Sequence, residues 1–220
     1  MKNIKAIIFD AYGTLFDVNS AAEKCKDKIG DKWEAFANFW RTTQLEYTWL
    51  RSLMERHKDF WQVTEDSLDK SMKAFNIDLS MKDELLNLYK VLSPYKEVPE
   101  TLKTLKEKKF KLAILSNGTP SLLNELVKSN NLDNLFDDIF SIEEVGVYKP
   151  SSKVYDIPIK KYQIEKSEVA FLSANTWDVS GGGNYGYQSI WVNRNNNIFD
   201  NLDYKPQNEI KNLKELLNII

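Results

Sequence analysis

The stretch KAIIFDAYGT, residues 5–14, decides the fold class, because its apolar, strand-forming residues stop at a carboxylate. Residues 4–9 predict a buried strand, and Asp10 stands where that strand ends. Four further runs of β-branched or aromatic residues predict strands at 111–115, 138–141, 169–173 and 188–192. Longer helical patterns separate these runs, which is typical of a parallel sheet joined by crossover helices. The sequence therefore predicts an α/β protein with helices on both faces of a parallel sheet.

The first two predicted strands are separated by residues 10–110, far more than one crossover connection needs. Helical patterns fill this interval at residues 21–29, 32–57, 64–75 and 81–92. Pro94, Tyr95 and Pro99 mark its exit, and a helix at residues 100–108 resumes the alternation. We therefore expect an all-helical cap, residues 16–94, inserted into a core made of residues 1–15 and 95–220.

The amino-acid composition limits which kinds of ligand and which cellular compartment we expect for this protein. The 220 residues include 30 basic and 32 acidic side chains, so no positive surplus favours nucleic acid or an anionic membrane. Cys25 is the one cysteine and His57 the one histidine, which leaves neither a disulfide nor a clustered Cys or His metal site. No leader-like start and no apolar run of about 18 residues is present. We expect a cytoplasmic protein with a small ligand.

Polar residues follow each of the first four predicted strands. Asp10 follows the first strand, Ser116 and Asn117 the second, Lys149 the third, and residues 173–178 the fourth. Any one of these sets is compatible with an ordinary turn, since Asp, Ser and Asn favour turns on local grounds. The carboxyl ends of parallel strands meet at one edge of the sheet, where ligands bind. Four polar sets at that edge indicate a functional site.

Five motifs resemble the haloacid dehalogenase superfamily. FDAYGTLFDV (9–18), LAILSNGTP (112–120) and GVYKPSSKVYD (146–156) resemble the superfamily as a whole. WRTTQLEYTWLR (40–51) and SANTWD (173–178) are similar to its L-2-haloacid dehalogenase group. The resemblance covers nearly the whole chain. It implies a Rossmann-like core with a helical cap, a homodimer, and hydrolysis of short L-2-haloacids to D-2-hydroxyacids and halide, with inversion at carbon two and no metal or organic cofactor.

Asp10 is the candidate nucleophile. A carboxylate displaces a leaving group at a saturated carbon only when it is ionised, desolvated and rigidly aimed, and the end of a buried strand provides that anchor. The superfamily's phosphatases carry a second Asp two residues later, where Tyr12 stands here. A departing halide needs no proton donor, so Tyr12 favours carbon–halogen cleavage over phosphoryl transfer. Tyr12 is either a packing aromatic or, as the resemblance implies, a wall of the pocket, and Ala11 tunes the pocket volume.

Lys149 is the candidate cation beside the nucleophile. Pro150 biases Lys149 towards an extended conformation, and Ser151 is placed to cap a helix that carries Tyr155 one turn in. An ammonium near Asp10 keeps the carboxylate ionised. Tyr155 is expected in the same cluster.

The cap supplies the candidate substrate residues. Arg41 precedes Leu45 by one helical turn, and a guanidinium among apolar side chains suits a small anion, although a solvated face is the usual place of a lone Arg. The resemblance favours substrate binding by Arg41. It assigns Phe60 and Leu45 to the pocket, with a core role equally open for Phe60.

The remaining candidates follow strands of the core. Asn117 and Trp177 would form a halide cradle with Arg41, while core packing remains open for Trp177. Thr14 and Ser116 would hydrogen-bond the anionic groups at Asp10, and backbone N–H groups after Asp10 would stabilise an oxyanion. By resemblance, Ser173, Asn175 and Asp178 position and activate the hydrolytic water. Asp178 alternatively caps its segment and pairs with Lys149.

Two features predict no function, and two other activities stay open. The Gly181–Gly183 run is expected to be a flexible turn and His57 a residue of the cap surface, while residues 193–197 predict a loop. A magnesium-dependent phosphatase of the same superfamily and a catalytically silent binding protein are the alternatives to a dehalogenase.

Overall fold

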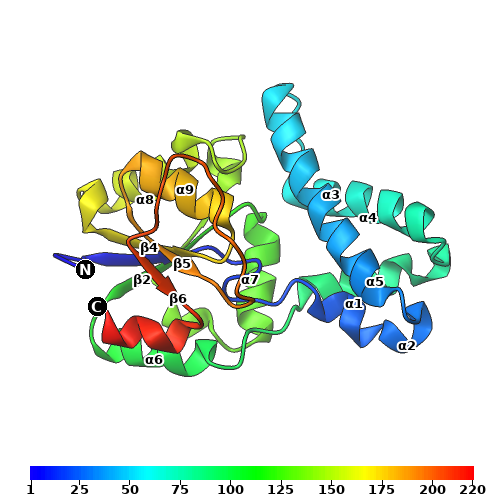
Figure 1. Cartoon of the computed structure of the whole chain (residues 1–220), viewed down its shortest axis with the longest axis horizontal. Coiled ribbons are helices and arrows are strands. Elements are labelled where there is room, and N and C mark those ends of the chain that lie inside the picture. The colour runs from blue at the N-terminus through cyan, green and yellow to red at the C-terminus, as the bar shows by residue number, and fades with distance from the viewer.

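The central sheet of the core is parallel throughout. The computed structural model describes all residues from Met1 to Ile220, and Figure 1 shows an α/β core beside a separate group of helices. The six strands are β1 (Ala6–Phe9), β2 (Lys111–Ser116), β3 (Asp138–Ser141), β4 (Val169–Ser173), β5 (Gln188–Val192) and β6 (Asn208–Ile210). Their order is β3-β2-β1-β4-β5-β6. All five predicted strands are confirmed within two residues at each end.

The sixth strand was not predicted. It is only three residues long, and Asn208 and Glu209 give it none of the apolar character of the inner strands. It is held at the sheet edge by pairing with β5. Nothing in its local sequence distinguishes it from a loop, because its structure depends on that pairing.

Helices cover both faces of the sheet, as predicted for an α/β fold. Figure 1 shows α8 (Ser152–Tyr162) and α9 (Thr176–Tyr185) over one face, with α6 (Val98–Glu107) and the C-terminal 3₁₀ segment Leu213–Asn218 on the other. Helix α7 (Pro120–Ser129) connects β2 to β3. Strand β1 lies in the middle of the sheet with all four side chains buried. The residue that follows it, Asp10, is therefore anchored to a buried strand that is paired on both sides.

The inserted region is all helical, as expected. Its helices are α1 (Ser20–Lys24), α2 (Lys26–Ile29), α3 (Trp33–Leu53), α4 (Phe60–Phe75) and α5 (Lys82–Lys90). The single helix expected at residues 21–29 is instead two short helices that meet at Cys25. Helix α3 stops before His57 because Glu55 adopts a left-handed conformation, with φ of 56°. Helix α4 begins earlier than expected because the Asp59 carboxylate accepts a hydrogen bond from Gln62 N and caps it.

Two connections join the helical region to the core and lie side by side. Asp17 N donates to Ser93 O at 2.9 Å, and Tyr95 N donates to Leu15 O at 3.0 Å. Arg194, in the loop after β5, donates to the Thr14 carbonyl at 2.8 Å. The connections thus cross near residues 15–17 and 93–95. The division of the chain into 1–15 with 95–220 and 16–94 stays a prediction that is compatible with this crossing.

The Gly181–Gly183 run is helical, so the expectation of a flexible turn is wrong. All three glycines lie inside α9, where close neighbours leave no room for side chains. A Cβ atom on Gly181 would lie 2.5 Å from the Tyr155 hydroxyl, and one on Gly183 would lie 2.0 Å from the Tyr204 ring. The glycines are therefore required by packing rather than by flexibility, a reason that the local sequence does not contain.

None of the helices combines the length and the apolar character needed to cross a lipid bilayer.

Candidate active site

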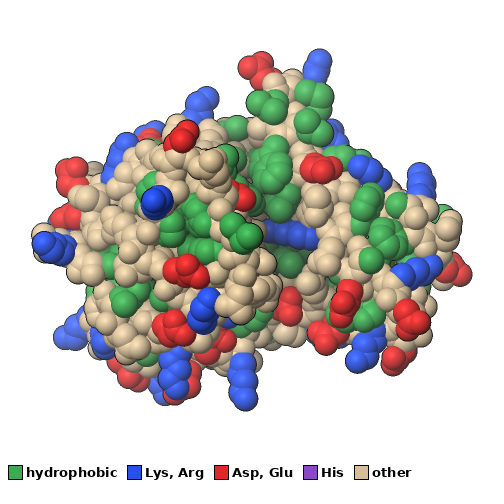
Figure 2. Space-filling model, in the orientation of Figure 1, with side chains coloured by type: hydrophobic (Ala, Val, Ile, Leu, Met, Phe, Trp, Pro, Cys, Tyr) green, Lys and Arg blue, Asp and Glu red, His purple; other side chains and the backbone are tan.

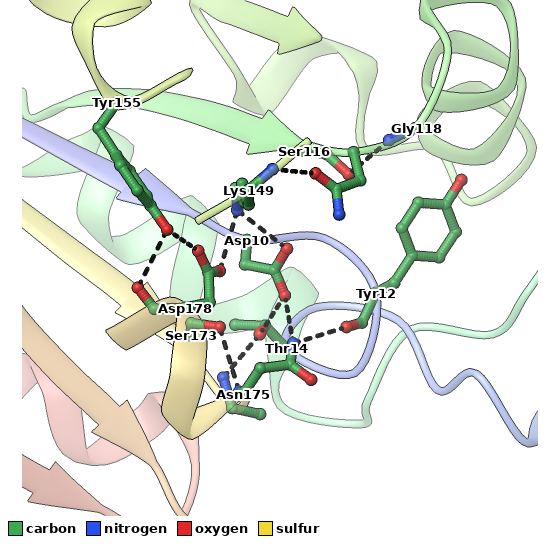
Figure 3. A network of polar contacts seen from close by, with 12 residues as sticks. Asp10, Tyr12, Thr14, Ser116, Gly118, Lys149, Tyr155, Ser173, Asn175 and Asp178 are labelled. Carbon is green, nitrogen blue, oxygen red and sulfur yellow. Dashed lines mark hydrogen bonds and ion pairs between the residues drawn. The ribbon is translucent and has the colours of Figure 1, made fainter. Parts of the chain in front are cut away.

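The carboxylate of Asp10 lies at the carboxyl edge of the sheet, where β1, β2 and β4 end. Asp10 N donates to Leu172 O of β4 at 2.9 Å, which extends the strand pairing to the residue itself. Only 5% of Asp10 is exposed. Figure 3 shows the side chain at the centre of a polar cluster drawn from several separate segments of the core. The sequence expectation that these segments meet at one edge is therefore met by the fold.

Each oxygen of Asp10 has a different set of partners. Oδ2 accepts hydrogen bonds from Thr14 Oγ1 at 2.9 Å and from Asn175 Nδ2 at 3.0 Å. Oδ1 lies 3.2 Å from Lys149 Nζ and accepts no other hydrogen bond. The two neutral donors fix the plane of the carboxylate through Oδ2. Oδ1 is thus the oxygen with room for a further reaction partner.

The direction of the Thr14 hydrogen bond is set by its neighbours. Ala174 N donates to Thr14 Oγ1 at 2.8 Å, so the hydroxyl hydrogen remains free to point at Asp10. Asn175 N donates to Ser173 Oγ at 3.1 Å, which holds the start of α9 close to the same carboxylate. The side chains of Thr14, Ser173 and Asn175 therefore form one connected support beneath Asp10 (Figure 3).

Lys149 joins two buried carboxylates. Its ammonium lies 2.9 Å from Asp178 Oδ2 and 3.2 Å from Asp10 Oδ1, and the side chain is fully buried. Ser151 occupies the N-cap position of α8, as expected, but its side chain makes no capping hydrogen bond. A buried ammonium between two carboxylates offsets charge that would otherwise be costly in the protein interior. Lys149 therefore lies where the sequence places it, beside the candidate nucleophile.

Asp178 is fully buried and engaged at both oxygens. Tyr155 OH donates to Asp178 Oδ1 at 2.7 Å, while Lys149 occupies Oδ2. Burial raises the pKa of Asp178, and the Lys149 charge opposes that rise. Burial likewise raises the pKa of Tyr155, which keeps its hydroxyl a donor. Asp178 lies inside the first turn of α9 while Asn175 takes the N-cap position, so the alternative of a capping role is wrong and the pairing with Lys149 is present.

Ser116 and Asn117 lie beside the cluster without touching Asp10. Ser116 Oγ accepts from Gly118 N at 3.2 Å and makes no hydrogen bond to Asp10, while its own hydroxyl hydrogen stays available. Asn117 Oδ1 accepts from Lys149 N at 3.1 Å, which leaves the Asn117 amide hydrogens free of protein partners. Both side chains are buried. They are placed to meet a ligand rather than to hold the carboxylate.

Gly118 is a residue that the sequence reasoning missed. A Cβ atom at this position would lie 3.0 Å from the hydroxyl of Tyr12 and equally close to Leu123. That separation is tighter than ordinary van der Waals contact, so a side chain at 118 would push the Tyr12 ring aside. The clue was the glycine in SNG, whose importance depends on a residue more than a hundred positions earlier in the chain.

Tyr12 reaches from the core into the helical region. Its ring stacks on Tyr89 of α5 at 5.7 Å and 19°, and packs against Phe60 of α4 at 5.2 Å. Burial raises the pKa of Tyr12 well above its ordinary value, so the phenol stays neutral. Phe60 is buried and also contacts Tyr148, which fits the core role as well as the pocket role expected for it. Ala11, which lies between Asp10 and Tyr12 in the chain, is fully buried.

Arg41 on α3 approaches the same cluster from the helical side. Its Nη2 lies 3.4 Å from the Tyr12 carbonyl, which Asn175 Nδ2 also reaches at 3.4 Å. Its Nη1 donates to Gln44 Oε1 at 2.9 Å. Arg41 is half-buried, so the solvated-face reading is wrong. Leu45, one turn later on α3, is also half-buried.

Trp177 lies on α9 at the boundary between the core and the helical region. It packs edge to face on Trp49 of α3, with ring centroids 5.4 Å apart and planes at 81°. The indole N–H of Trp49 is buried without a partner. Figure 2 shows a furrow between the two parts of the molecule, with hydrophobic side chains on its walls and a basic side chain at its floor. Trp177 therefore packs across the boundary between the core and the helical region, and Trp49 is a further residue that the sequence reasoning missed.

Two backbone N–H groups next to Asp10 are free. The N–H groups of Ala11 and Tyr12 donate to no acceptor in the loop, whereas those of Thr14, Leu15 and Phe16 all donate to Ala11 O. Free N–H groups beside a carboxylate are placed to bind an oxyanion that forms on it. The oxyanion role expected for the backbone after Asp10 stays a prediction that these free N–H groups permit.

His57 lies at the cap surface with its side chain partly exposed, but it also contacts the core, which the sequence does not indicate. Its Nε2 lies 2.9 Å from Glu143 Oε2 of the core, and its ring packs on Tyr148. The Tyr148 hydroxyl donates to the Lys58 carbonyl at 2.6 Å. The loop between α3 and α4 is thus tied to the segment that precedes Lys149. The contact joins residues 86 positions apart, which local pattern cannot reveal.

The arrangement supports covalent chemistry at Asp10. The Asp10 carboxylate has one lightly bonded oxygen, a buried ammonium beside it and free N–H groups on the next two residues, and a half-buried guanidinium lies 3.4 Å from the Tyr12 carbonyl. These are the parts that nucleophilic displacement by a carboxylate followed by hydrolysis of an ester requires.

Comparisons with known proteins point the same way. The family described as haloacid dehalogenase-like hydrolase matches residues 4–186. An (S)-2-haloacid dehalogenase of Pseudomonas putida is 39% identical over 222 aligned residues, which cover 99% of this chain and 97% of that protein. A dehalogenase crystal structure that is 35% identical superposes with a TM-score of 0.98, covering 100% of this chain and 98% of that one. The L-2-haloacid dehalogenase of Xanthobacter autotrophicus with chloropropionic acid covalently bound is 31% identical, with a TM-score of 0.91 and 98% of each chain covered.

Proposed function

The chain belongs to the haloacid dehalogenase-like hydrolases, and from that premise we propose that it is a hydrolytic (S)-2-haloacid dehalogenase. Its substrates are short 2-haloalkanoic acids, with L-2-haloacids converted to D-2-hydroxyacids and halide. The similarity over 99% of the chain to an (S)-2-haloacid dehalogenase supports this substrate class. The observation that carries the proposal is the Asp10 carboxylate, which is buried, clamped through Oδ2 and contacted at Oδ1 by Lys149 alone.

In the first step, Asp10 Oδ1 attacks carbon two of the substrate from the side opposite the halogen. The new C–O bond forms as the carbon–halogen bond breaks, and the electron pair of that bond leaves with the halide. The configuration at carbon two inverts. The Lys149 ammonium lies beside Asp10 Oδ1, and Thr14 and Asn175 keep the carboxylate from rotating. Positioning of this kind supplies much of the rate enhancement when two groups react in line.

Side chains around the furrow bind the substrate and the departing halide. Arg41 and the free amide hydrogens of Asn117 provide positive hydrogen-bond donors, and the edge of the Trp177 ring adds a third contact. Ser116 meets the substrate carboxylate. Ala11, Tyr12, Leu45 and Phe60 give the apolar walls that limit the size of the acid. A halide bound among such donors leaves as a stabilised anion.

In the second step, water attacks the carbonyl carbon of the Asp10 ester. The free N–H groups of Ala11 and Tyr12 stabilise the oxyanion that forms. Ser173 and Asn175 position the water and Asp178 accepts its proton. The raised pKa of Asp178 makes it a stronger base than an exposed aspartate. Collapse of the oxyanion breaks the bond between the carboxyl carbon of Asp10 and the ester oxygen, which takes up the proton held by Asp178, so that the product leaves as the hydroxyacid. The remaining proton of the water is lost to solvent as Asp10 returns to its carboxylate form, and Tyr155 holds Asp178 in place.

Halide release tests the proposal against its nearest alternative. With (S)-2-chloropropanoate we expect chloride and D-lactate in equal amounts, at a rate that a chelator of divalent cations leaves unchanged. Phosphate esters offered with magnesium should give no phosphate, because Tyr12 replaces the second Asp of the superfamily's phosphatases. Magnesium-dependent release of phosphate that a chelator abolishes, with no halide from any 2-haloacid, would favour the phosphatase. No turnover of either class would leave the silent binding protein.

We also propose that the enzyme is a cytoplasmic homodimer. Leu50, Leu53 and Met54, exposed by 50%, 81% and 60%, form an apolar group at the end of α3 that a second copy would cover. The unpaired thiol of Cys25 is compatible with a reducing compartment. Sedimentation velocity tests the oligomer, and a species of 25.6 kDa at all concentrations would contradict it. Cell fractionation tests the location.

A further inference from the structure

The position of the Arg41 side chain depends chiefly on the buried side-chain amide of Gln44. Arg41 Nη1 donates to Gln44 Oε1 at 2.9 Å, a shorter contact than the 3.4 Å between Nη2 and the Tyr12 carbonyl. Arg41 and Gln44 are three residues apart on α3, so their side chains lie on one face of the helix. A long, flexible guanidinium side chain needs such an acceptor if it is to meet a small anion in a fixed place.

The Gln44 amide is the meeting point of three helices of the cap. It is 1% exposed, and its Nε2 donates to Thr64 Oγ1 on α4 at 2.7 Å and to Tyr89 OH on α5 at 3.0 Å. Thr64 is fully buried. None of these contacts reaches the Asp10 cluster directly. Together they hold the Gln44 side chain in place, and Gln44 in turn fixes the position of Arg41.

The hydrogen-bond pattern decides which end of the amide faces Arg41. The Thr64 hydroxyl donates its one hydrogen to the Phe60 carbonyl at 2.7 Å, so its oxygen acts as an acceptor towards Gln44. The NH₂ end of Gln44 must therefore face Thr64, which turns Oε1 towards Arg41. Tyr89 does not make this choice, because its hydroxyl lies within hydrogen-bond distance of both Nε2 and Oε1 and serves either orientation.

We propose that Thr64 and Gln44 are positioning residues for the reaction: Thr64 orients the buried Gln44 amide so that its oxygen, and not its NH₂ group, holds Arg41 for the anionic groups of the substrate. With the amide reversed, two donors would face each other and the guanidinium would turn away. This inference deepens the proposed function and rests on it, since that function gives Arg41 the halide or the carboxylate to bind. The halide and the carboxylate are both small anions, and Arg41 would bind either one.

A matched pair of variants isolates the hydroxyl. Thr64→Val removes the acceptor while nearly keeping the volume, and Thr64→Ser keeps the acceptor while losing a methyl group. NMR titrations with sodium bromide and with sodium propionate measure the affinity for each anion without turnover. We expect Thr64→Val to bind at least one of them about 5- to 30-fold more weakly than Thr64→Ser, the factor that corresponds to a loss of about 1 to 2 kcal/mol. The anion that weakens identifies the group that Arg41 holds.

Steady-state kinetics and a second residue separate positioning from a structural effect. For (S)-2-chloropropanoate, Thr64→Val should raise KM by a similar factor if propionate binding is weakened, or lower kcat by a similar factor if bromide binding is weakened. Thr64→Ser should keep both parameters close to those of the wild type. On a Gln44→Met background, Thr64→Val should have no further effect on anion affinity, because Thr64 acts through Gln44. If Thr64→Val does not fold, Gln44→Met alone should show the weaker anion binding.

The outcomes that overturn the inference differ from those that overturn the function. Equal anion affinities in Thr64→Val and Thr64→Ser, or an undiminished effect of Thr64→Val on the Gln44→Met background, would contradict the positioning role. Anion binding at the wild-type level in Gln44→Met would do the same. A wild-type enzyme that binds propionate but releases no halide would instead contradict the proposed function and leave the anion comparison intact.

Discussion

Asp10→Asn should reduce halide release on the order of 10⁴-fold or more, the loss seen when an enzyme's nucleophile is removed. An amide keeps the shape of the side chain and still accepts from Thr14, but it lacks the negative charge that attacks carbon two. The loss should appear in kcat, measured as chloride released from (S)-2-chloropropanoate. Substrate contacts from Arg41 and Asn117 remain, so KM should change far less.

Asp203→Asn is the matched control for Asp10→Asn. Asp203 is exposed and has a φ of 53°, a conformation that Asn adopts readily, so this variant should keep full activity. Thermal unfolding of both variants shows that each is folded. Halide release by Asp10→Asn at a rate within tenfold of the wild type would mean that another group attacks the substrate.

Lys149→Met is expected to have the second largest effect, a fall in kcat on the order of 10²- to 10³-fold. The substitution removes the ammonium that lies between Asp10 and Asp178 and leaves both carboxylates without their cation. Both halves of the reaction suffer, because the nucleophile and the base are each affected. The measurement is kcat across a range of pH.

The pH dependence of Lys149→Met gives the sign of the effect. The Lys149 charge lowers the pKa of Asp178 against the rise caused by burial, so its removal should raise that pKa further. Asp178 accepts a proton only when ionised, and the acid limb of the kcat profile should therefore move to higher pH. Lys153→Met, an exposed substitution on α8, should move neither the limb nor kcat. An unmoved limb in Lys149→Met would contradict the place of Asp178 in the reaction.

The features that the sequence predicts best are those set by local pattern. The apolar run ending at Asp10 and the later β-branched runs define the five longer strands because each pattern is complete within a few residues. The Lys149 to Asp10 pairing was also foreseeable. In a parallel sheet the strand ends converge, so residues that follow successive strands meet whatever the length of chain between them.

Contacts between distant segments explain what the sequence could not predict. The Gly181–Gly183 run reads as a turn until Tyr155, Phe171 and Tyr204 are packed against it. His57 has no visible partner until the α3–α4 loop meets Glu143.

The same holds within the cap. Gln44 and Thr64 look like ordinary polar residues on two amphipathic helices, and their hydrogen bond exists only because α3 and α4 pack together. A polar residue on the buried face of each helical pattern was the one signal available, because buried polar groups are hydrogen-bonded and therefore specify their partners.

The most direct test of the covalent role of Asp10 is a single turnover in water enriched in oxygen-18, with enzyme in excess over (S)-2-chloropropanoate. If Asp10 forms the ester, the first molecule of lactate carries an unlabelled hydroxyl oxygen taken from Asp10, and mass spectrometry finds one heavy oxygen in the peptide that contains Asp10. Labelled lactate from the first turnover, with an unlabelled Asp10 peptide, would show that water attacks the carbon directly and would contradict the account.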